Sequence, residues 1–236
     1  MQTRLFEDVQ STPPMLPGLV PSSIAAASLV VLSSSSGGNC SALVLEGPSP
    51  SILLIDLGLS PRRTRLLLAA AGLGDLPIAG AVVTHLDVDH YHAGWAGRVR
   101  AAWPAGASVF MHRKHLGRAE RDGLLFGRAI PFEREFEPIP GVRVWSHLVS
   151  HDSLGCSSLR ISVAGRDLGW ATDVGRPTDE LASHLHAVDV LAIESNYCPR
   201  LEQESSRPEF LKRRIMGGSG HLSNPQCADL TRRIAP

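Results

Sequence analysis

The chain has 236 residues, of which 43% are hydrophobic and 19% are charged, values that are ordinary for a globular protein with one large core. Basic and acidic residues number 23 each, so the net charge offers no general attraction to an anionic partner, and a nucleic-acid substrate would need a local basic patch. No apolar run reaches the ~18 residues of a membrane span, and no secretory signal is recognised, so we expect a cytoplasmic protein without membrane contact.

The N-terminal residues 1–22 contain four prolines and little periodicity, which predicts an extended arm before a single domain over 23–236. Short apolar runs then recur at strand length. The predicted strands are 28–32, 42–45, 52–55, 79–83, 108–111, 142–145, 159–163, 168–171 and 188–193. The predicted helices are 62–71, 207–215 and 224–234. Strands in two batches, with helices between and after them, predict an α/β fold of two packed sheets flanked by helices.

The four cysteines, Cys40, Cys156, Cys198 and Cys227, are far apart and form no CxxC pair. This spacing argues against a zinc knuckle or a dithiol redox motif. We therefore expect free thiols, with Cys40 and Cys156 in the core.

Four candidate metal ligands follow the predicted strand 79–83 within six residues: His85, Asp87, Asp89 and His90. A strand end and a tight turn can aim alternate side chains in one direction, so His85 and Asp87 would meet one metal ion and Asp89 and His90 a second. Buried together without a cation, such groups would be costly to desolvate. The alternative is an exposed polar loop, in which Asp and His are common.

Three further candidate ligands each follow a strand-like run or lie in a glycine-rich turn: His151, Asp173 and His221. Each alone has a simpler explanation, as a surface histidine or a helix-capping aspartate. Together they are more informative, because sheets gather functional side chains at one edge. His112 and His115 flank basic residues in a stretch that looks exposed, and we do not expect them to be ligands.

The segment 85–90 resembles the HxHxDH signature of the metallo-β-lactamase superfamily, with Asp87 in place of the second histidine. Further segments resemble, in order along the chain, those of the YycJ-type (WalJ-type) nucleases within that superfamily. They are SSSSGGNC at 33–40, IDLGLS at 55–60, SHD at 150–152, ATDVG at 171–175, ESNY at 194–197, LKRRI at 211–215 and GHLSN at 220–224.

The resemblance implies an αββα sandwich of two mixed sheets flanked by helices, with two divalent metal ions at one edge of the sheets. It implies that the first metal is held by His85, Asp87 and His151. It implies that the second is held by Asp89, His90 and His221, with Asp173 bridging the two. Asp56 would orient a ligand or the metal-binding loop, and Asp152 would either orient His151 or cap a turn.

Two departures from the family pattern affect these expectations. Asp87 is a harder ligand than histidine, which shifts the preference from zinc toward manganese, iron or magnesium. The chain also stops soon after His221, where relatives continue through another strand and helix, so we expect those last elements to be shortened or missing.

The resemblance favours a metal-dependent hydrolase, a phosphodiesterase or nuclease with DNA-exonuclease character. Two cations, zinc or manganese, about 3.5–4 Å apart would hold a bridging water and give hydroxide near neutral pH. Asp89, Asp173 and His221 are the expected catalytic residues. Lys212, Arg213 and Arg214 are candidate phosphate-binding residues, although a solvated helix face explains them equally well.

Two other hypotheses stay open at this point. A small-molecule hydrolase of the same fold, acting on a lactone or thioester, would need a closed apolar pocket where a nuclease needs an open basic groove. A binding module that has lost its catalytic site would account for Asp87 and the short C-terminal part, but not for the six other candidate ligands.

Overall fold

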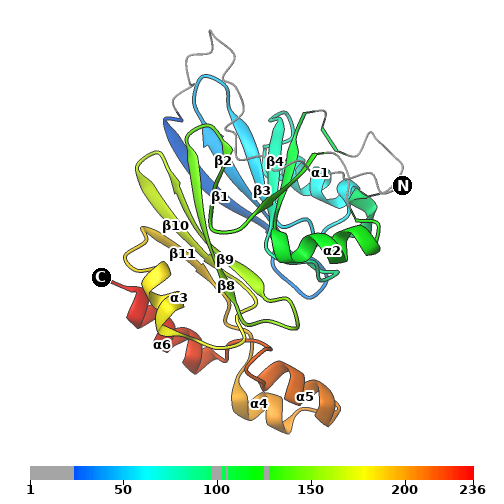
Figure 1. Ribbon diagram of the computed structural model, residues 1–236, viewed down its shortest axis with the longest axis vertical. Helices are drawn as coiled ribbons and strands as arrows, with labels where there is room; N and C mark the ends of the chain where they lie inside the picture. Colours follow the sequence, from blue (N-terminus) through cyan, green and yellow to red (C-terminus); the bar gives the residue numbers. More distant parts are fainter. Residues whose placement is uncertain (1–23, 97–102, 105, 125–127) are drawn as a thin grey trace, which may run out of the picture.

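A computed structural model describes residues 24–96, 103–104, 106–124 and 128–236, and Figure 1 shows two facing sheets with helices on their outer sides. The predicted N-terminal arm, residues 1–22, lies outside the described residues. The α/β class and the sandwich of two mixed sheets are confirmed.

The first sheet has six strands in the order β1-β2-β3-β4-β5-β6. β1, β2 and β3 pair antiparallel, and β3 to β6 pair parallel. The strands are β1 Ala26–Ser33, β2 Cys40–Glu46, β3 Ser51–Ile55, β4 Ile78–Val83, β5 Ser108–His112 and β6 Arg128–Phe132.

The second sheet has five strands in the order β11-β10-β9-β8-β7. Only β10 and β11 pair parallel, and the other neighbours are antiparallel. The strands are β7 Glu135–Ile139, β8 Val142–Val149, β9 Cys156–Val163, β10 Arg166–Ala171 and β11 Val190–Ile193.

The sequence analysis misses β6 and β7, and both are edge strands of their sheets. Each contains a proline, Pro131 and Pro138 respectively. Proline cannot donate to a strand ladder, so it argues against a central strand but is tolerated at an edge. The missing information is therefore the position of the strand in the sheet, which only the topology supplies.

The helices lie in two pairs on the outer faces of the sheets, and a third pair extends away from them (Figure 1). α1 and α2 cover the first sheet, α3 and α6 cover the second, and α4 and α5 form the extension. The helices are α1 Pro61–Ala70, α2 Arg113–Arg121, α3 Asp179–His184, α4 Pro199–Glu204, α5 Glu209–Met216 and α6 Asn224–Ile234, with a 3₁₀ turn η1 at Ala93–Trp95. The sequence analysis predicts α1, α5 and α6 and misses the others.

Alternate residues of the central strand β3 enter different core layers. Ile52 and Leu54 pack beneath α1 and α2, while Leu53 and Ile55 pack between the two sheets. Because both faces are buried, the strand is apolar from Ile52 to Ile55, as central strands of covered sheets are. A third apolar layer, which contains Leu181 and Leu230, joins the second sheet to α3 and α6.

Cys40 and Cys156 are buried free thiols, as expected, and Cys198 and Cys227 are half-buried and also free. Among the described helices, none combines the length and apolar character needed to cross a membrane.

The carboxyl ends of strands from both sheets meet at one edge of the sandwich. β3 and β4 are parallel and are followed by Asp56 and His85. β8, β10 and β11 also share one direction, because β8 and β10 both run antiparallel to β9, and the residues just beyond their ends include His151, Asp173 and Glu194. The topology alone therefore gathers polar side chains from distant segments at this edge.

Gly58 fixes how closely two loops approach each other at this edge. A Cβ atom at position 58 would lie 1.7 Å from the carbonyl oxygen of Asp89 and 2.6 Å from the backbone nitrogen of Asn39. The Gly58 N–H donates to the Asn39 carbonyl at 2.9 Å, and the Leu57 N–H donates to the His90 carbonyl at 2.8 Å. Only glycine fits at this contact.

We expect Gly58→Ala to lower the free energy of unfolding by about 1–3 kcal/mol or more, because backbone on both sides must move to admit a methyl group. Equilibrium urea denaturation measures the change. Gly117→Ala in α2 is the matched control, because a Cβ atom there would approach only Arg121 Nη1, at 3.7 Å. This substitution should raise the free energy of unfolding by about 1 kcal/mol, since alanine favours a helix more than glycine does. A Gly58→Ala protein as stable as the parent would contradict the packing described.

Candidate metal centre

Histidine and aspartate side chains from four separate segments converge at the shared strand edge. The loop after β4 supplies His85, Asp87 and His90, β8 leads into His151, and β10 leads into Asp173. His221 comes from the turn between α5 and α6. The structure thus brings together six of the seven side chains that the sequence proposes as ligands.

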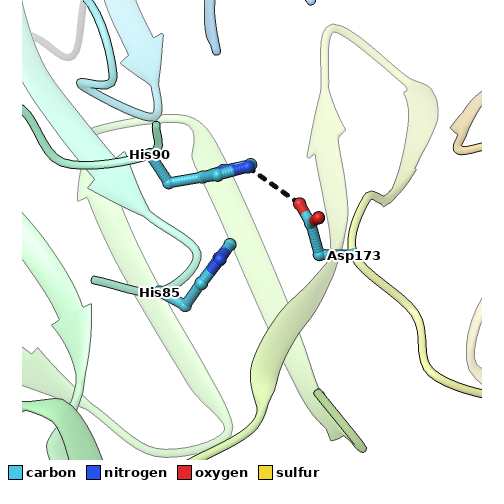
Figure 2. Close-up of side chains that lie close together, drawn as sticks. All are labelled: His85, His90 and Asp173. Atoms are coloured by element: carbon cyan, nitrogen blue, oxygen red, sulfur yellow. Dashed lines mark ion pairs between the residues drawn. The ribbon is translucent and has the colours of Figure 1, made fainter. Parts of the chain in front are cut away.

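These side chains form three overlapping groups, and the candidate ligand atoms within each group lie within 4.8 Å of one another. The groups are His85, His90 and Asp173; His85, Asp87 and His151; and His151, Asp173 and His221. Each group combines two imidazoles with one carboxylate, a donor set that suits zinc, manganese and ferrous iron. In Figure 2 the rings of His85 and His90 extend from one side toward Asp173 on the other.

The grouping differs in part from the expected partition of ligands. His85, Asp87 and His151 stand together as the resemblance implies. Asp89, His90 and His221 do not form a group; His90 and His221 each join Asp173 instead. Asp173 takes part in two groups, and its backbone φ of +54° lies in the left-handed region, a sparsely populated conformation for a residue other than glycine.

Asp56 holds the start of the histidine loop, although it is in none of the three groups. Its Oδ1 accepts hydrogen bonds from the backbone N–H of Thr84 at 2.8 Å and from the Thr84 hydroxyl at 2.9 Å. Its Oδ2 lies 2.8 Å from His90 Nδ1. Because Asp56 accepts at Nδ1, Nε2 of His90 is left to face the centre.

His90 lies between two carboxylates, with Nδ1 at 2.8 Å from Asp56 and Nε2 at 2.8 Å from Asp173. Burial opposes the charged imidazolium, but the two carboxylates outweigh it and hold the pKa of His90 well above its usual value. Burial also disfavours ionised Asp173, yet the adjacent His90 lowers the pKa of that carboxyl. A metal ion would compete with the proton for the same nitrogen.

The two other buried imidazoles, His85 and His151, have different partners. Burial, reinforced by the neighbouring His90, lowers the pKa of His85 well below its usual value, so this ring is neutral and able to ligate. His151 Nδ1 lies 2.9 Å from the carbonyl oxygen of Gly220. The backbone of the His221 turn thus holds this nitrogen, whereas the Asp152 side chain, for which we left open orienting His151 or capping a turn, pairs with Arg214.

Asp87, which replaces the family histidine, is paired with an arginine that the sequence analysis did not identify. Arg118 of α2 donates to Asp87 Oδ1 at 3.0 Å, while Oδ2 lies 3.9 Å from both His85 Nε2 and His151 Nε2. Burial raises the pKa of Asp87, but its interactions with Asp152, Arg118 and His85 outweigh the burial and lower the pKa. The guanidinium thus compensates the extra negative charge and leaves one oxygen facing the imidazoles.

Glu194 is the second functional residue that sequence reasoning missed. Its Oε2 lies 3.0 Å from His221 Nδ1, and its Oε1 accepts hydrogen bonds from the backbone N–H groups of Leu222 and Val174. Burial disfavours the charged form of His221, but Glu194 raises its pKa overall. Glu194 directly follows the apolar strand β11, so the strand-end rule that singles out Asp173 would also have found it.

Asp89 stands apart from the three groups and is held by Asn39. The Asn39 amide lies 3.3 Å from both Asp89 Oδ2 and the Asp89 carbonyl, and 2.9 Å from His90 Nε2. Asp89 Oδ2 is 3.8 Å from His90 Nε2. Asn39 belongs to the serine- and glycine-rich segment 33–40 and joins that loop to the histidine loop.

Only one of the three basic residues proposed to contact phosphate faces the centre. Lys212 is 7% exposed, and its ammonium donates to the Gln203 carbonyl at 2.7 Å, so this candidate is wrong because the charge is used to hold α4 and α5 together. Arg213 stays on the outer face of its helix. Arg214 lies 2.9 Å from Asp152 and 3.9 Å from Asp87.

The exposed setting predicted for His112 and His115 is also wrong. Both are buried, because the segment that follows β5 forms α2 and packs on the first sheet. Burial lowers the pKa of His115 to about 4, with His112 and Arg118 adding to the effect. His115 is therefore neutral, and it belongs to none of the metal-binding groups among the described residues.

The sequence model of the metallo-beta-lactamase superfamily matches residues 36–165, more than half of the chain. The match includes His85, His90 and His151, while Asp173 and His221 lie beyond it. A relative, exodeoxyribonuclease YycJ of Bacillus anthracis, is 28% identical over 205 residues, which are 84% of this chain and 74% of the relative.

Two solved structures share the fold. The metallo-beta-lactamase fold protein YhfI of Bacillus subtilis superposes with a TM-score of 0.60 at 14% identity, over 87% of this chain and 80% of that protein. Zinc-bound PqqB of Methylobacterium extorquens superposes with a TM-score of 0.59 at 18% identity, over 84% and 79% of the respective chains.

We expect Glu194→Gln to weaken metal binding by about 10- to 100-fold, as loss of a group that orients a ligand does. The amide N–H₂ would face His221 Nδ1 and favour the tautomer with its proton on Nε2. Competition with a fluorescent chelator measures the affinity. Glu204→Gln, which removes an exposed carboxylate paired with Arg200, is the control, and equal effects of the two variants would contradict this role.

Proposed function

The chain belongs to the metallo-β-lactamase superfamily and is a metal-dependent hydrolase, and from this premise we propose that it is a DNA exonuclease. The observation that carries the proposal is the convergence of two-histidine, one-carboxylate groups on the shared strand edge. The relatives named exodeoxyribonucleases in Bacillus anthracis and Streptococcus pneumoniae favour DNA over a lactone or thioester. The overlapping ligand groups argue against a module without catalytic function.

We propose that the centre holds two divalent cations, zinc or manganese, on neighbouring ligand sets. His85, Asp87 and His151 would hold one cation, His90 and His221 would serve the other, and Asp173 would contact both. When bound, the pair supplies Lewis-acid chemistry, since it acidifies a water molecule and withdraws charge from a phosphodiester.

The surrounding residues fix the donors before the substrate arrives. Asp56 holds His90 and the Gly220 carbonyl holds His151, each at Nδ1, so both imidazoles present Nε2 to the centre. His221 Nδ1 lies between Glu194, at 3.0 Å, and Asp173, at 3.3 Å. Such fixed donors need little reorganisation as charge develops on the phosphate. We propose that Asp89, held by Asn39, takes or returns a proton at its carboxylate during hydrolysis.

Arg214 is the residue proposed to attract the DNA backbone. It lines a cavity of about 240 Å³ together with His85, Asp87, His151 and Asp152. The Arg214 side chain is exposed. Its guanidinium lies 2.9 Å from the carboxylate of Asp152, which holds it beside the cavity. A positioned guanidinium in this place can bind a phosphate oxygen next to the scissile bond.

We expect the purified protein with manganese to shorten end-labelled linear DNA and to leave covalently closed circular DNA intact. Asp89→Ala and His221→Ala should abolish turnover while the circular-dichroism spectrum and cooperative unfolding are retained, because both side chains lie at the surface of the centre. His92→Ala is the control, since His92 only caps η1. Full activity of either site variant would refute the assignment.

Elemental analysis of protein purified without chelator should give two equivalents of divalent metal per chain. Asp87→Ala should retain about one equivalent, because Asp87 belongs to one of the three ligand groups and Asp173 to the other two. A single equivalent in the parent protein would contradict the paired centre.

A further inference from the structure

A second cavity, of about 520 Å³, adjoins the centre, and Arg214 is not among the residues that line it. Ser36, Asp89, Asp173 and His221 line both this cavity and the smaller one, so the two cavities meet at the centre. Its volume falls within the range of roughly 300–1,000 Å³ that is typical of small-molecule sites. It lies where the space between the sheets reaches the strand edge, with β1 and β2 on one side and β10 and β11 on the other.

Two residues that line this cavity each have a buried polar atom without a hydrogen-bond partner among the described residues. These atoms are the indole nitrogen of Trp170 and the hydroxyl oxygen of Thr172, both at the end of β10. Trp170 is only 5% exposed. Because buried polar groups in native proteins are nearly always satisfied, unpaired ones beside a cavity indicate a ligand or water that completes them.

The rim of the cavity adds neutral hydrogen-bonding groups, and part of its wall is apolar. Ser34, Ser36 and Asn196 line it, and their side chains make no hydrogen bond to other described residues. Val31 and Ile193 contribute apolar surface. This combination of an apolar wall with several neutral donors and acceptors suits a heterocycle and a sugar.

The charges of the two cavities differ in a way that orients a DNA strand. No lysine or arginine lines the 520 Å³ cavity, whereas Arg214 lines the smaller one. In the larger cavity a run of phosphates would meet the carboxylates of Asp89, Asp173 and Glu194, with His221 as the one imidazole in the lining. The larger cavity therefore suits an uncharged group attached to a single phosphate at the centre.

We propose that the 520 Å³ cavity is the subsite for the terminal nucleoside of the DNA strand, which hydrolysis releases as a mononucleotide. Water adds to the scissile phosphorus, the P–O bond to the adjacent sugar breaks, that sugar oxygen leaves with a proton, and the phosphate stays on the released nucleoside. The scissile phosphate lies at the ligand groups, and the remaining strand leaves past Arg214. Trp170 and Thr172 donate hydrogen bonds to the nucleoside, and the serine-rich loop at residues 33–36 covers it. This inference rests on the proposed exonuclease function and adds to it the site that recognises the strand end.

The test compares binding of 2′-deoxyadenosine 5′-monophosphate and 2-deoxyribose 5-phosphate to the full chain by calorimetry. The two probes share the sugar phosphate, so their difference isolates the base. We expect the nucleotide to bind at least tenfold more tightly. Thr172→Val, Trp170→Phe and Ser34→Ala should each reduce that preference about two- to tenfold, as loss of one hydrogen bond does, with metal content unchanged.

Arg214→Gln is the matched variant for the smaller cavity. It should leave the preference for the nucleotide over the sugar phosphate unchanged, because both probes have the same phosphate. It should weaken binding of a single-stranded oligonucleotide, with a salt dependence reduced by about one phosphate contact. Thr172→Val is nearly isosteric and Ser34 is exposed, so at least two cavity variants will fold.

Equal affinities for the two probes, or an unchanged preference in all three cavity variants, would overturn the subsite. If DNA is degraded while the preference is absent, the subsite alone fails. If the preference is present and depends on the cavity, but linear DNA is not degraded, the exonuclease function alone fails.

Discussion

The buried carboxylate of Asp56 is the contact on which the geometry of the centre depends. Its oxygens accept hydrogen bonds from the backbone N–H and the hydroxyl of Thr84 and contact Nδ1 of His90. One side chain therefore fixes the loop that contains four candidate ligands. Its backbone φ is +63°, a conformation that only a tightly packed environment maintains in a residue other than glycine. Gly58 permits the close approach that this packing requires.

Charge balance is the second constraint on this edge of the sandwich. Asp56, Asp87, Asp173 and Glu194 gather in or beside a largely buried site, which would be strongly unfavourable for carboxylates alone. Imidazoles accompany three of them, and Arg118 accompanies Asp87. Cations at the ligand groups would complete this balance. The replacement of a histidine by Asp87 is thus matched by an arginine from α2, a helix on the other side of the loop.

Two cavities of different chemistry adjoin the centre, and this asymmetry follows from the topology. The larger cavity is the open end of the space between the sheets, which explains its mixture of apolar walls and neutral polar groups. The smaller lies against α5, whose last turn contributes Arg214. An asymmetric centre of this kind can distinguish the end of a polymer from its interior.

The sequence by itself determined the class of fold, most of the central strands and the candidate ligand residues that follow them, because apolar periodicity and strand-end polar clusters are local signals. It did not determine β6 and β7, whose prolines are tolerated only at an edge, or the burial of His115 and Lys212. Those outcomes depend on what packs against each segment. Arg118, Glu194, Asn39 and Gly220 acquire their roles in the tertiary structure alone, because each acts on a residue distant in sequence that only the packed sheets bring within hydrogen-bond distance.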